Sequence, residues 1–334
     1  MTRVAVLGAG SWGTALAVHL GRIGHDVGLW ARDRALAADI ETRRVNELYL
    51  PGVLLPDSVR VTGAMDAVLA GAPLVISAVP SQGCRTVMRT ARPLLGRGVT
   101  IVSTTKGLES ATRLRMSEVI GQELGDETPI VVLSGPTFAT EVARQLPAAV
   151  LVASHNPHAI EHVQQEFRSQ AFRLYGSEDV IGVEIAGALK NVIAIAAGVV
   201  EGLGLGHNAM AALVTRGLAE IARLVTAAGG RRETPSGLSG LGDLVLTCTG
   251  SLSRNRHVGI ELGRGRSLAD VLASMKMVAE GVNTTNVALA LGERYGVELP
   301  ITAQMAEVLS GRCDVQAALG ALMLRPQRHE VDVT

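Results

Sequence analysis

Apolar residues follow two different patterns along this chain, and the change between them lies near Ser177. Before that point short apolar runs alternate with segments of helical spacing, which is the pattern of buried strands joined by helices. Beyond it the runs stop, and apolar residues recur at helical spacing almost to the end. The predicted strands are residues 3–7, 26–30, 74–78, 100–103, 129–133, 148–154 and 172–177, and the predicted helices of the second half are 183–201, 207–229, 255–263, 267–275, 284–295 and 302–310.

This order of elements predicts an α/β domain followed by an all-α domain. Strands that alternate with helices are typical of a parallel sheet covered on both faces, so residues 1–180 are expected to form a Rossmann-type doubly wound sheet. Residues 181–325 are expected to form a C-terminal all-helical domain, and residues 326–334 a loose polar tail. At 334 residues the chain is long enough for two hydrophobic cores.

Composition and charge exclude several classes of protein. The 31 basic and 31 acidic side chains cancel, so the chain has no overall field that would attract nucleic acid or an anionic membrane. Three widely spaced cysteines argue against a disulfide framework and fit a reducing compartment. His158 and His162 are spaced for a metal but lack a third ligand, so no metal site is expected. No stretch reaches the ~18 uncharged apolar residues of a membrane span. We therefore expect a cytoplasmic protein without nucleic-acid binding or membrane insertion.

The first candidate site is a glycine-rich turn between the first predicted strand and the helix after it. Gly8, Gly10 and Gly13 form a GxGxxG motif, with Ser11 and Trp12 inside it. A strand precedes the motif, a helix follows it, and a second strand closes the unit within about 30 residues, which is the context of a dinucleotide-binding site. The glycines let the backbone approach a pyrophosphate, and the helix start offers it free N–H groups. We predict a dinucleotide cofactor here.

The residues after the second strand bear on the choice of cofactor. An acid at this place binds the ribose 2′-hydroxyl of NAD, whereas an arginine accommodates the 2′-phosphate of NADP. The chain has Ala31-Arg32-Asp33. Arg32 favours NADP(H), Asp33 keeps NAD(H) possible, and both side chains could instead be solvated loop residues.

Three later strands end in polar or turn-forming residues that we expect at one edge of the sheet. The segments are Val79-Pro80-Ser81, Thr104-Thr105-Lys106-Gly107 and Ser134-Gly135-Pro136-Thr137-Phe138-Ala139. Ligands of doubly wound sheets bind outside the carboxyl ends of the strands, so we interpret Lys106 as a ligand contact rather than a surface charge. Gly135-Pro136 also predicts a helix start with proline at the first position, which would place Thr137 and Ala139 near free N–H groups.

The predicted helix 183–201 is apolar on most sides, yet Lys190 stands in its middle. Ala186, Ile193 and Ala194 fall on the face that carries the lysine. In such surroundings desolvation lowers the pKa of an ammonium group toward the range useful for proton transfer. The alternative is a lysine that extends to solvent from a helix near the surface.

Two further segments of the second half look chemical. Ser253, Arg254 and Asn255 stand in a turn before a predicted helix, where a hydroxyl, a forked cation, an amide and free N–H groups can hold a phosphate. The alternative is an ordinary helix cap with a solvated arginine. Asp243 lies in the glycine-rich segment that leads to this turn, and Glu280 is the one acid of the loop 277–281.

Together these segments resemble one family, the bacterial-type NAD(P)-dependent glycerol-3-phosphate dehydrogenases. The resemblance covers nearly the whole chain, and its motifs stand in the order and spacing of the family. Position 137 is often serine in the family, and Thr137 keeps the hydroxyl. The motifs are GAGSWGTA (8–15), LWARD (29–33), STTKGLE (103–109), LSGPTFATE (133–141), EIAGALKNVIAIAAG (184–198), GLGDLVLTC (240–248), SRNR (253–256) and VAEGVNT (278–284).

The resemblance implies interconversion of sn-glycerol 3-phosphate and dihydroxyacetone phosphate, which supplies glycerol 3-phosphate for phospholipid synthesis. It implies that Lys190 transfers the proton, that Lys106 and Asp243 orient the substrate and set the pKa of this lysine, and that the chain forms a homodimer. Another two-domain NADP-dependent reductase of a small acid or ketone, or a non-catalytic nucleotide sensor, would share the fold. The implied cofactor contacts are Ser11, Trp12, Arg32, Lys106, Ala139, Arg254, Val278 and Glu280, and the implied substrate contacts are Lys106, Gly135, Thr137, Lys190, Asp243, Ser253, Arg254 and Asn255.

Overall fold

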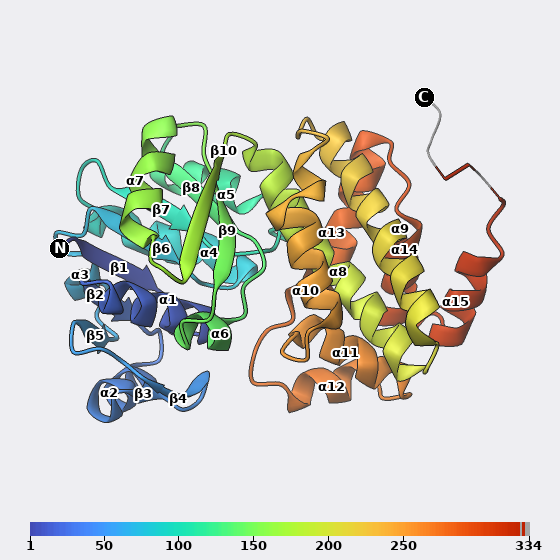
Figure 1. The fold of residues 1–334 in the computed structure, drawn as a ribbon, viewed down its shortest axis with the longest axis horizontal. Coiled ribbons are helices and arrows are strands. Elements are labelled where there is room, and N and C mark those ends of the chain that lie inside the picture. Colours follow the sequence, from blue (N-terminus) through green and yellow to red (C-terminus); the bar gives the residue numbers. More distant parts are fainter. Residues whose placement is uncertain (328, 331–334) are drawn as a thin grey trace.

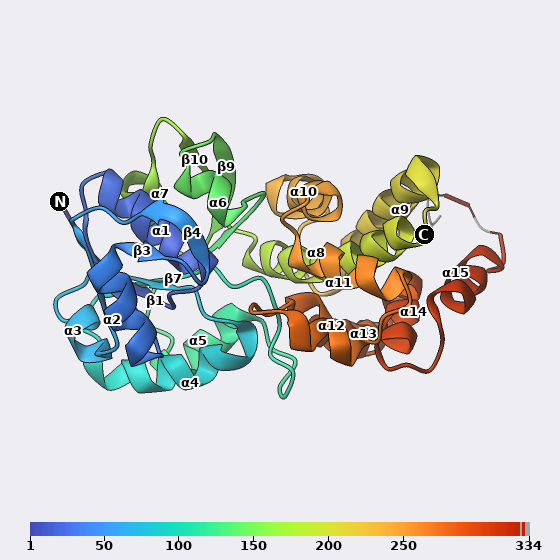
Figure 2. The same ribbon diagram turned by 90° about the horizontal axis from the view of Figure 1, so that it is seen from below.

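The computed structural model describes residues 1–327, 329 and 330, and it divides into a sheet with helices on both faces and a body made of helices. Figures 1 and 2 show the two bodies side by side, with the long helix α8 running from their boundary into the helical body. The change of architecture follows the last strand, which ends at Ser177. Five residues of the expected C-terminal tail, 328 and 331–334, lie outside the described part of the chain.

The main sheet has eight strands in the order β10-β9-β8-β7-β6-β1-β2-β5. From β5 to β8 all neighbours are parallel, and the order is that of a doubly wound nucleotide-binding sheet whose direction reverses between β1 and β6. The predicted Rossmann-type sheet is confirmed, with one difference: β9 runs antiparallel to β8, and β10 is parallel to β9. The strands are β1 (Arg3–Leu7), β2 (Asp26–Trp30), β5 (Val59–Thr62), β6 (Leu74–Ser77), β7 (Thr100–Ser103), β8 (Ile130–Ser134), β9 (Ala148–Ala153) and β10 (Phe172–Ser177).

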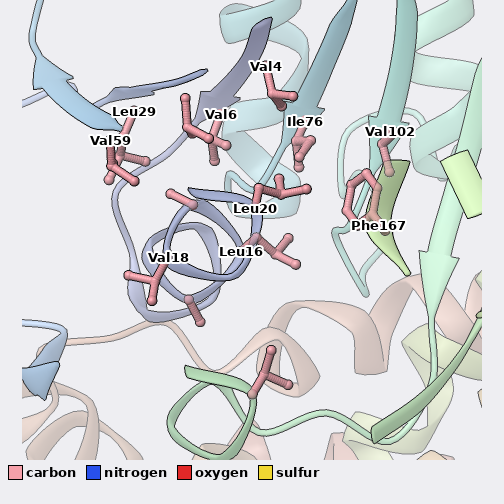
Figure 3. Close-up of a cluster of buried hydrophobic side chains, with 14 of the residues drawn as sticks. Val4, Val6, Leu16, Val18, Leu20, Leu29, Val59, Ile76, Val102 and Phe167 are labelled. Carbon is pink, nitrogen blue, oxygen red and sulfur yellow. The ribbon is translucent and has the colours of Figure 1, made fainter. Parts of the chain in front are cut away.

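Alternating side chains of the central strands pack into two hydrophobic cores, one on each face of the sheet. Val4 and Val6 of β1 pack with Leu16 and Leu20 of α1, as Figure 3 shows. Leu7 points to the opposite face and shares a core with α3, α4 and α5. The helices of this domain are α1 (Ser11–Arg22), α2 (Arg34–Arg43), α3 (Met65–Leu69), α4 (Ser81–Ala91), α5 (Met116–Leu124), α6 (Ala139–Ala143) and α7 (Pro157–Phe167).

Two local predictions for this domain were wrong or incomplete. Pro136 does not begin a helix, because the chain stays in a turn from Gly135 to Phe138 and α6 begins at Ala139. Strand β5 was not predicted, and neither was the small hairpin of β3 (Val45–Asn46) and β4 (Leu50–Leu54).

The helical domain is built around α8 (Val180–Gly202), whose side chains are almost all buried. By length and composition α8 could cross a membrane, but its most apolar stretch is enclosed by the domain, as in the core helix of a soluble protein. All six predicted helices are present, whereas α10 and α15 were not predicted. The other helices are α9 (Gly206–Ala227), α10 (Asp243–Thr249), α11 (Arg254–Gly263), α12 (Leu268–Ser274), α13 (Glu280–Tyr295), α14 (Pro300–Leu309) and α15 (Val315–Met323).

Two pairs of glycines bring α8 and α11 into backbone contact. A Cβ atom on Gly259 would lie 1.9 Å from the carbonyl oxygen of Ile195, and one on Gly198 would lie 2.0 Å from that of Arg256. Gly202 and Gly263 meet in the same way one turn further along. This close crossing holds the start of α11 against the helix that carries Lys190.

Candidate active site

Lys190 is buried in the helical domain, with only 5% of the residue exposed. The reading in which its side chain extends to solvent is therefore wrong. Its Nζ lies 3.0 Å from Oδ1 of Asp243 and donates a hydrogen bond of 2.7 Å to Oγ1 of Thr247. Both partners come from α10, and Thr247 in turn donates to the backbone oxygen of Asp243, one turn earlier. The lysine thus has a defined direction.

Asp243 joins this lysine to a second one from the other domain. Lys106 follows strand β7, and its Nζ lies 2.8 Å from Oδ2 of Asp243. The same ammonium group donates to the backbone oxygen of Gly135 at 2.7 Å and lies 3.4 Å from Oγ1 of Thr137. Gly135 and Thr137 follow β8, the neighbour of β7, so the strand-end residues gather at one edge as predicted.

The three charged groups set the protonation of Lys190. Burial lowers the pKa of Lys190 to about 8, because the charged form loses hydration. Asp243 opposes this effect by attraction, and Lys106 adds to it by repulsion. An amine with a pKa near 8 can exchange its proton close to neutral pH.

Ser253, Arg254 and Asn255 form the start of α11. Ser253 is the N-cap, and its Oγ accepts a hydrogen bond from the backbone N–H of Arg256. Arg254 is exposed at the first helical position. Asn255 is buried: its Nδ2 donates to Oδ1 of Asn191, and its Oδ1 accepts from the N–H of Gly281. This turn is therefore compatible with both interpretations, a helix cap and an anion-binding site. It combines a cap, an exposed guanidinium and an anchored amide at a helix N-terminus.

The glycine-rich turn has the form that a dinucleotide needs. Gly8 has φ of +116°, and a Cβ atom there would lie 2.7 Å from the backbone oxygen of Ala78 on the neighbouring strand end. At Gly13 a Cβ atom would lie 1.9 Å from the oxygen of Gly8, so this glycine is needed for helix–strand packing. At Gly10, by contrast, a Cβ atom would meet nothing within 4 Å. Open space at the middle glycine alone is what a closely approaching pyrophosphate requires.

Two other observations fit a cofactor at this turn. Gly10, the N-cap of α1, supplies no side-chain cap, so the first N–H groups of the helix face outward. Nε1 of Trp12 is buried and has no hydrogen-bond partner among the described residues. A buried polar atom of this kind is costly unless a ligand or water satisfies it.

The loop before α13 reaches across to the same turn. Oγ of Ser11 lies 3.0 Å from Sδ of Met277, and Val278 is 43% exposed. Glu280 accepts hydrogen bonds from the N–H and Oγ of Ser81, at 2.8 and 2.5 Å, at the N-terminus of α4. Glu280 therefore holds the helical domain beside the strand ends that flank the predicted cofactor site.

Of the two charged residues that follow β2, Asp33 is engaged in a helix cap and Arg32 is exposed. Oδ1 of Asp33 accepts from the N–H groups of Ala35 and Leu36, so this carboxylate is the N-cap of α2. Arg32 is exposed beside it. Ala139, the remaining predicted cofactor contact, is the first residue of α6 and is half-buried.

Comparison with known proteins agrees with this geometry. Models of the N-terminus and the C-terminus of NAD-dependent glycerol-3-phosphate dehydrogenase match residues 3–160 and 179–320. The chain belongs to this family. Two relatives named glycerol-3-phosphate dehydrogenase (NAD(P)+) come from Koribacter versatilis and Acidobacterium capsulatum, and they are 53% and 51% identical to this chain. Each match covers 99% of this chain, and it covers 99% and 100% of the respective relative. The crystal structure of glycerol-3-phosphate dehydrogenase from Coxiella burnetii matches with a TM-score of 0.93 at 41% identity, over 96% of this chain and 98% of that one.

Membership of the glycerol-3-phosphate dehydrogenase family confirms the NAD(P)-dependent oxidoreductase class that the motifs predicted. The geometry gives defined roles to three residues that were not among the predicted cofactor or substrate contacts. Thr247 orients Lys190, Ser81 binds Glu280, and Asn191 links Asn255 to the backbone oxygen of Lys106 at 2.9 Å. Asn191 adjoins Lys190 in the sequence, but neighbours on a helix point in different directions, so only the fold shows where its amide goes.

Within the described part of the chain, no three His, Cys, Asp or Glu side chains converge as metal ligands would.

Proposed function

We propose that this chain interconverts sn-glycerol 3-phosphate and dihydroxyacetone phosphate, with Lys190 as the proton donor and acceptor. The observation that carries the proposal is the charged row Lys106–Asp243–Lys190, in which Asp243 and Lys190 are buried; it joins the strand ends of one domain to the core helix of the other. NAD(P)H, when bound at the glycine-rich turn, supplies the hydride for the ketone carbon.

Lys190 provides the proton and the compensating charge. As an ammonium group it donates a hydrogen bond to the substrate carbonyl oxygen, where negative charge gathers during reduction, and then gives up a proton to it. In the oxidation direction the neutral amine takes the proton from the hydroxyl group. Thr247 and Asp243 hold Nζ of Lys190 in place, so the ammonium group does not have to reorient during the reaction.

The phosphate end is held by the start of α11. Arg254 supplies a forked cation, Ser253 a hydroxyl and Asn255 the N–H that its bond to Asn191 leaves free. Lys106, Gly135 and Thr137 line the opposite, strand-end side. Binding energy at the phosphate fixes the position of the distant carbonyl group, which raises the rate at the reacting carbon.

For the cofactor, the relatives are named for NAD(P)+, and we propose that NADP(H) is preferred while NAD(H) is also used. Ser11, Trp12 and the uncapped start of α1 would hold the pyrophosphate side. Arg32 would bind the 2′-phosphate, and the capping role of Asp33 supports this choice because its carboxylate is engaged by α2. Ala139, Arg254, Val278 and Glu280 would complete the contacts near the domain boundary.

Several wider features belong to the same proposal. The boundary between the domains would lie at residue 180, the site of action would be the cytoplasm, and the product would supply phospholipid synthesis. A homodimer is expected from the family resemblance. Light scattering coupled to size-exclusion chromatography would show twice the 34.8 kDa mass of the chain if this is correct. A particle with the mass of one chain would refute the homodimer.

The deciding experiment follows NADPH oxidation with dihydroxyacetone phosphate as substrate. Wild-type protein should turn over, and Lys190→Met should lower kcat by ~10²-fold or more, the scale of losing general acid–base help. A loss confined to KM would contradict the proton-transfer role.

The same assay separates the two other readings. Equal activity with an unphosphorylated ketone would favour a different reductase. NADPH binding without turnover on either substrate would favour a nucleotide sensor.

A further inference from the structure

One side of α8 is the face that meets the sheet domain. Glu184, Gly187 and Asn191 are spaced i, i+3 and i+7, so they share this side. A Cβ atom on Gly187 would lie 2.9 Å from Oγ of Ser134 at the end of β8. Asn191 donates to the backbone oxygen of Lys106. Lys190 directly precedes Asn191 on the helix, so the position of Lys190 relative to the sheet depends on how this face of α8 packs against the sheet domain.

Glu184 makes three hydrogen bonds from that face to the sheet domain. Its side chain is 2% exposed, and its Oε2 accepts from Nη1 of Arg115 at 2.8 Å and from Oγ of Ser117 at 2.5 Å. Its Oε1 accepts from the backbone N–H of Ser117 at 2.8 Å. Because α5 begins at Met116, a carboxylate of the helical domain caps a helix of the sheet domain.

We propose that Glu184 is a positioning residue that sets Lys190 against the strand ends where Lys106 and the nicotinamide site lie. This inference rests on the proposed function. Glu184 precedes Lys190 by six residues, about 9 Å along the helix axis. The phosphate grip and Lys190 belong to the helical domain, whereas the glycine-rich turn belongs to the sheet domain. A rigid link between them matters because a misplacement of ~1 Å can cost ~10²-fold in rate.

Stability alone gives a weaker account of this buried pair. Taking two charges out of water offsets most of their attraction, so buried ion pairs contribute little net stability compared with apolar side chains. Fixed geometry is what a bidentate carboxylate with three donors does provide.

The chain contains a matched control in Glu220 of α9. This buried carboxylate accepts from the N–H groups of Ile301 and Thr302 at 2.5 and 3.3 Å and from the hydroxyl of Thr302, so it also caps another helix, α14. Both helices belong to the helical domain. Glu220→Gln therefore removes the same kind of interaction without touching the domain boundary.

The experiment compares Glu184→Gln with Glu220→Gln in the full chain. Thermal unfolding, NADPH affinity from fluorescence titration, and steady-state kinetics with dihydroxyacetone phosphate are measured for each. Both variants should unfold at lower temperature. Only Glu184→Gln should lose kcat, by about tenfold or more, while KM and the NADPH Kd stay within about twofold. The same kcat in both variants, or a Glu184→Gln defect confined to KM or Kd, would overturn the positioning role.

Three further results complete the test. If Glu184→Gln does not fold, Ser117→Ala removes one donor and keeps the N–H, and it should still lower kcat without raising KM; an unchanged kcat overturns the role. A wild-type protein that fails to reduce dihydroxyacetone phosphate overturns the proposed function and the positioning role together. If the wild type is active and Glu184→Gln and Glu220→Gln have the same kcat, only the positioning role is overturned.

Discussion

At the scale of single residues, the site depends on an amine whose environment pulls in two directions. Burial and Lys106 lower the pKa of Lys190, and Asp243 raises it, with a result of about 8. The sequence could predict that Lys190 was surrounded by apolar residues. Apolar spacing alone could not pair Lys190 with Asp243, 53 positions later, because that pairing depends on how α10 packs against α8; only the family resemblance predicted it.

The pH dependence should reveal this balance. Oxidation of glycerol 3-phosphate needs neutral Lys190, so its kcat/KM should rise as pH passes about 8 and then level off. Reduction of dihydroxyacetone phosphate needs the ammonium form and should fall above about pH 8. Asp243→Asn removes the group that raises the pKa, so both profiles should move to lower pH. Asp270→Asn, on α12, serves as the control and should leave both pH profiles unchanged. If Asp243→Asn also leaves them unchanged, Lys190 is not the titrating group.

Cofactor choice is also decided by single residues. Arg32→Glu should lower the preference for NADPH over NADH by about tenfold or more, since a charge-assisted bond is worth ~1.5–3 kcal/mol and ~1.4 kcal/mol is a factor of ten. The ratio of kcat/KM values with the two cofactors measures this. Arg43→Glu, at the other end of α2, reverses a charge on the same helix and should leave the ratio unchanged. If both variants shift it equally, the effect is general electrostatics.

At the scale of elements, the contact of α8 with α11 determines where the phosphate grip lies. Gly259→Ala would place a methyl group on the backbone of Ile195, so the helices must separate. We expect a loss of unfolding free energy of about 2 kcal/mol and a raised KM for dihydroxyacetone phosphate, both measured against wild type. Gly320→Ala on α15 adds a methyl group in open space and should keep both values near wild type. An unchanged KM in Gly259→Ala would separate the helix contact from phosphate binding.

The elements also show how far patterning reaches. Long segments with sustained periodicity, such as α8 and α9, were predicted within a few residues, because one buried face repeats over many turns. Strand β5 was missed because it has only four residues, VRVT, so its alternation of apolar and polar positions is too short to stand out from a loop. Its place in the sheet comes from pairing with β2. α10 was missed because it is seven residues long and follows a glycine-rich π-helical turn, where local signals favour a loop.

At the scale of the whole molecule, the sheet and the helical body have separate main hydrophobic cores, and a small buried cluster of Val132, Ala153, Val180 and Val183 packs between them. They are joined at the site by the Lys106–Asp243, Ser81–Glu280 and Arg115–Glu184 contacts. Motif order predicted that the two domains would share one active site. It could not predict that Ser81, one of the polar residues expected at the strand ends, would pair with Glu280, nor that Arg115, which has no distinctive local pattern, would pair with Glu184.

A cofactor held by groups of both domains should stabilise the molecule as one unit. NADPH at 100 times its Kd should raise the unfolding free energy by about 2.7 kcal/mol, seen as a shift in Tm. Gly10→Ala fills space that the protein leaves open, so the unliganded variant should fold while the NADPH-induced shift largely disappears. Gly121→Ala, on α5, adds a methyl group no closer than 3.8 Å to its neighbours and should keep the full shift. A full shift in Gly10→Ala would mean that the pyrophosphate does not approach the backbone at this glycine, and the cofactor would then have to lie elsewhere along the strand ends.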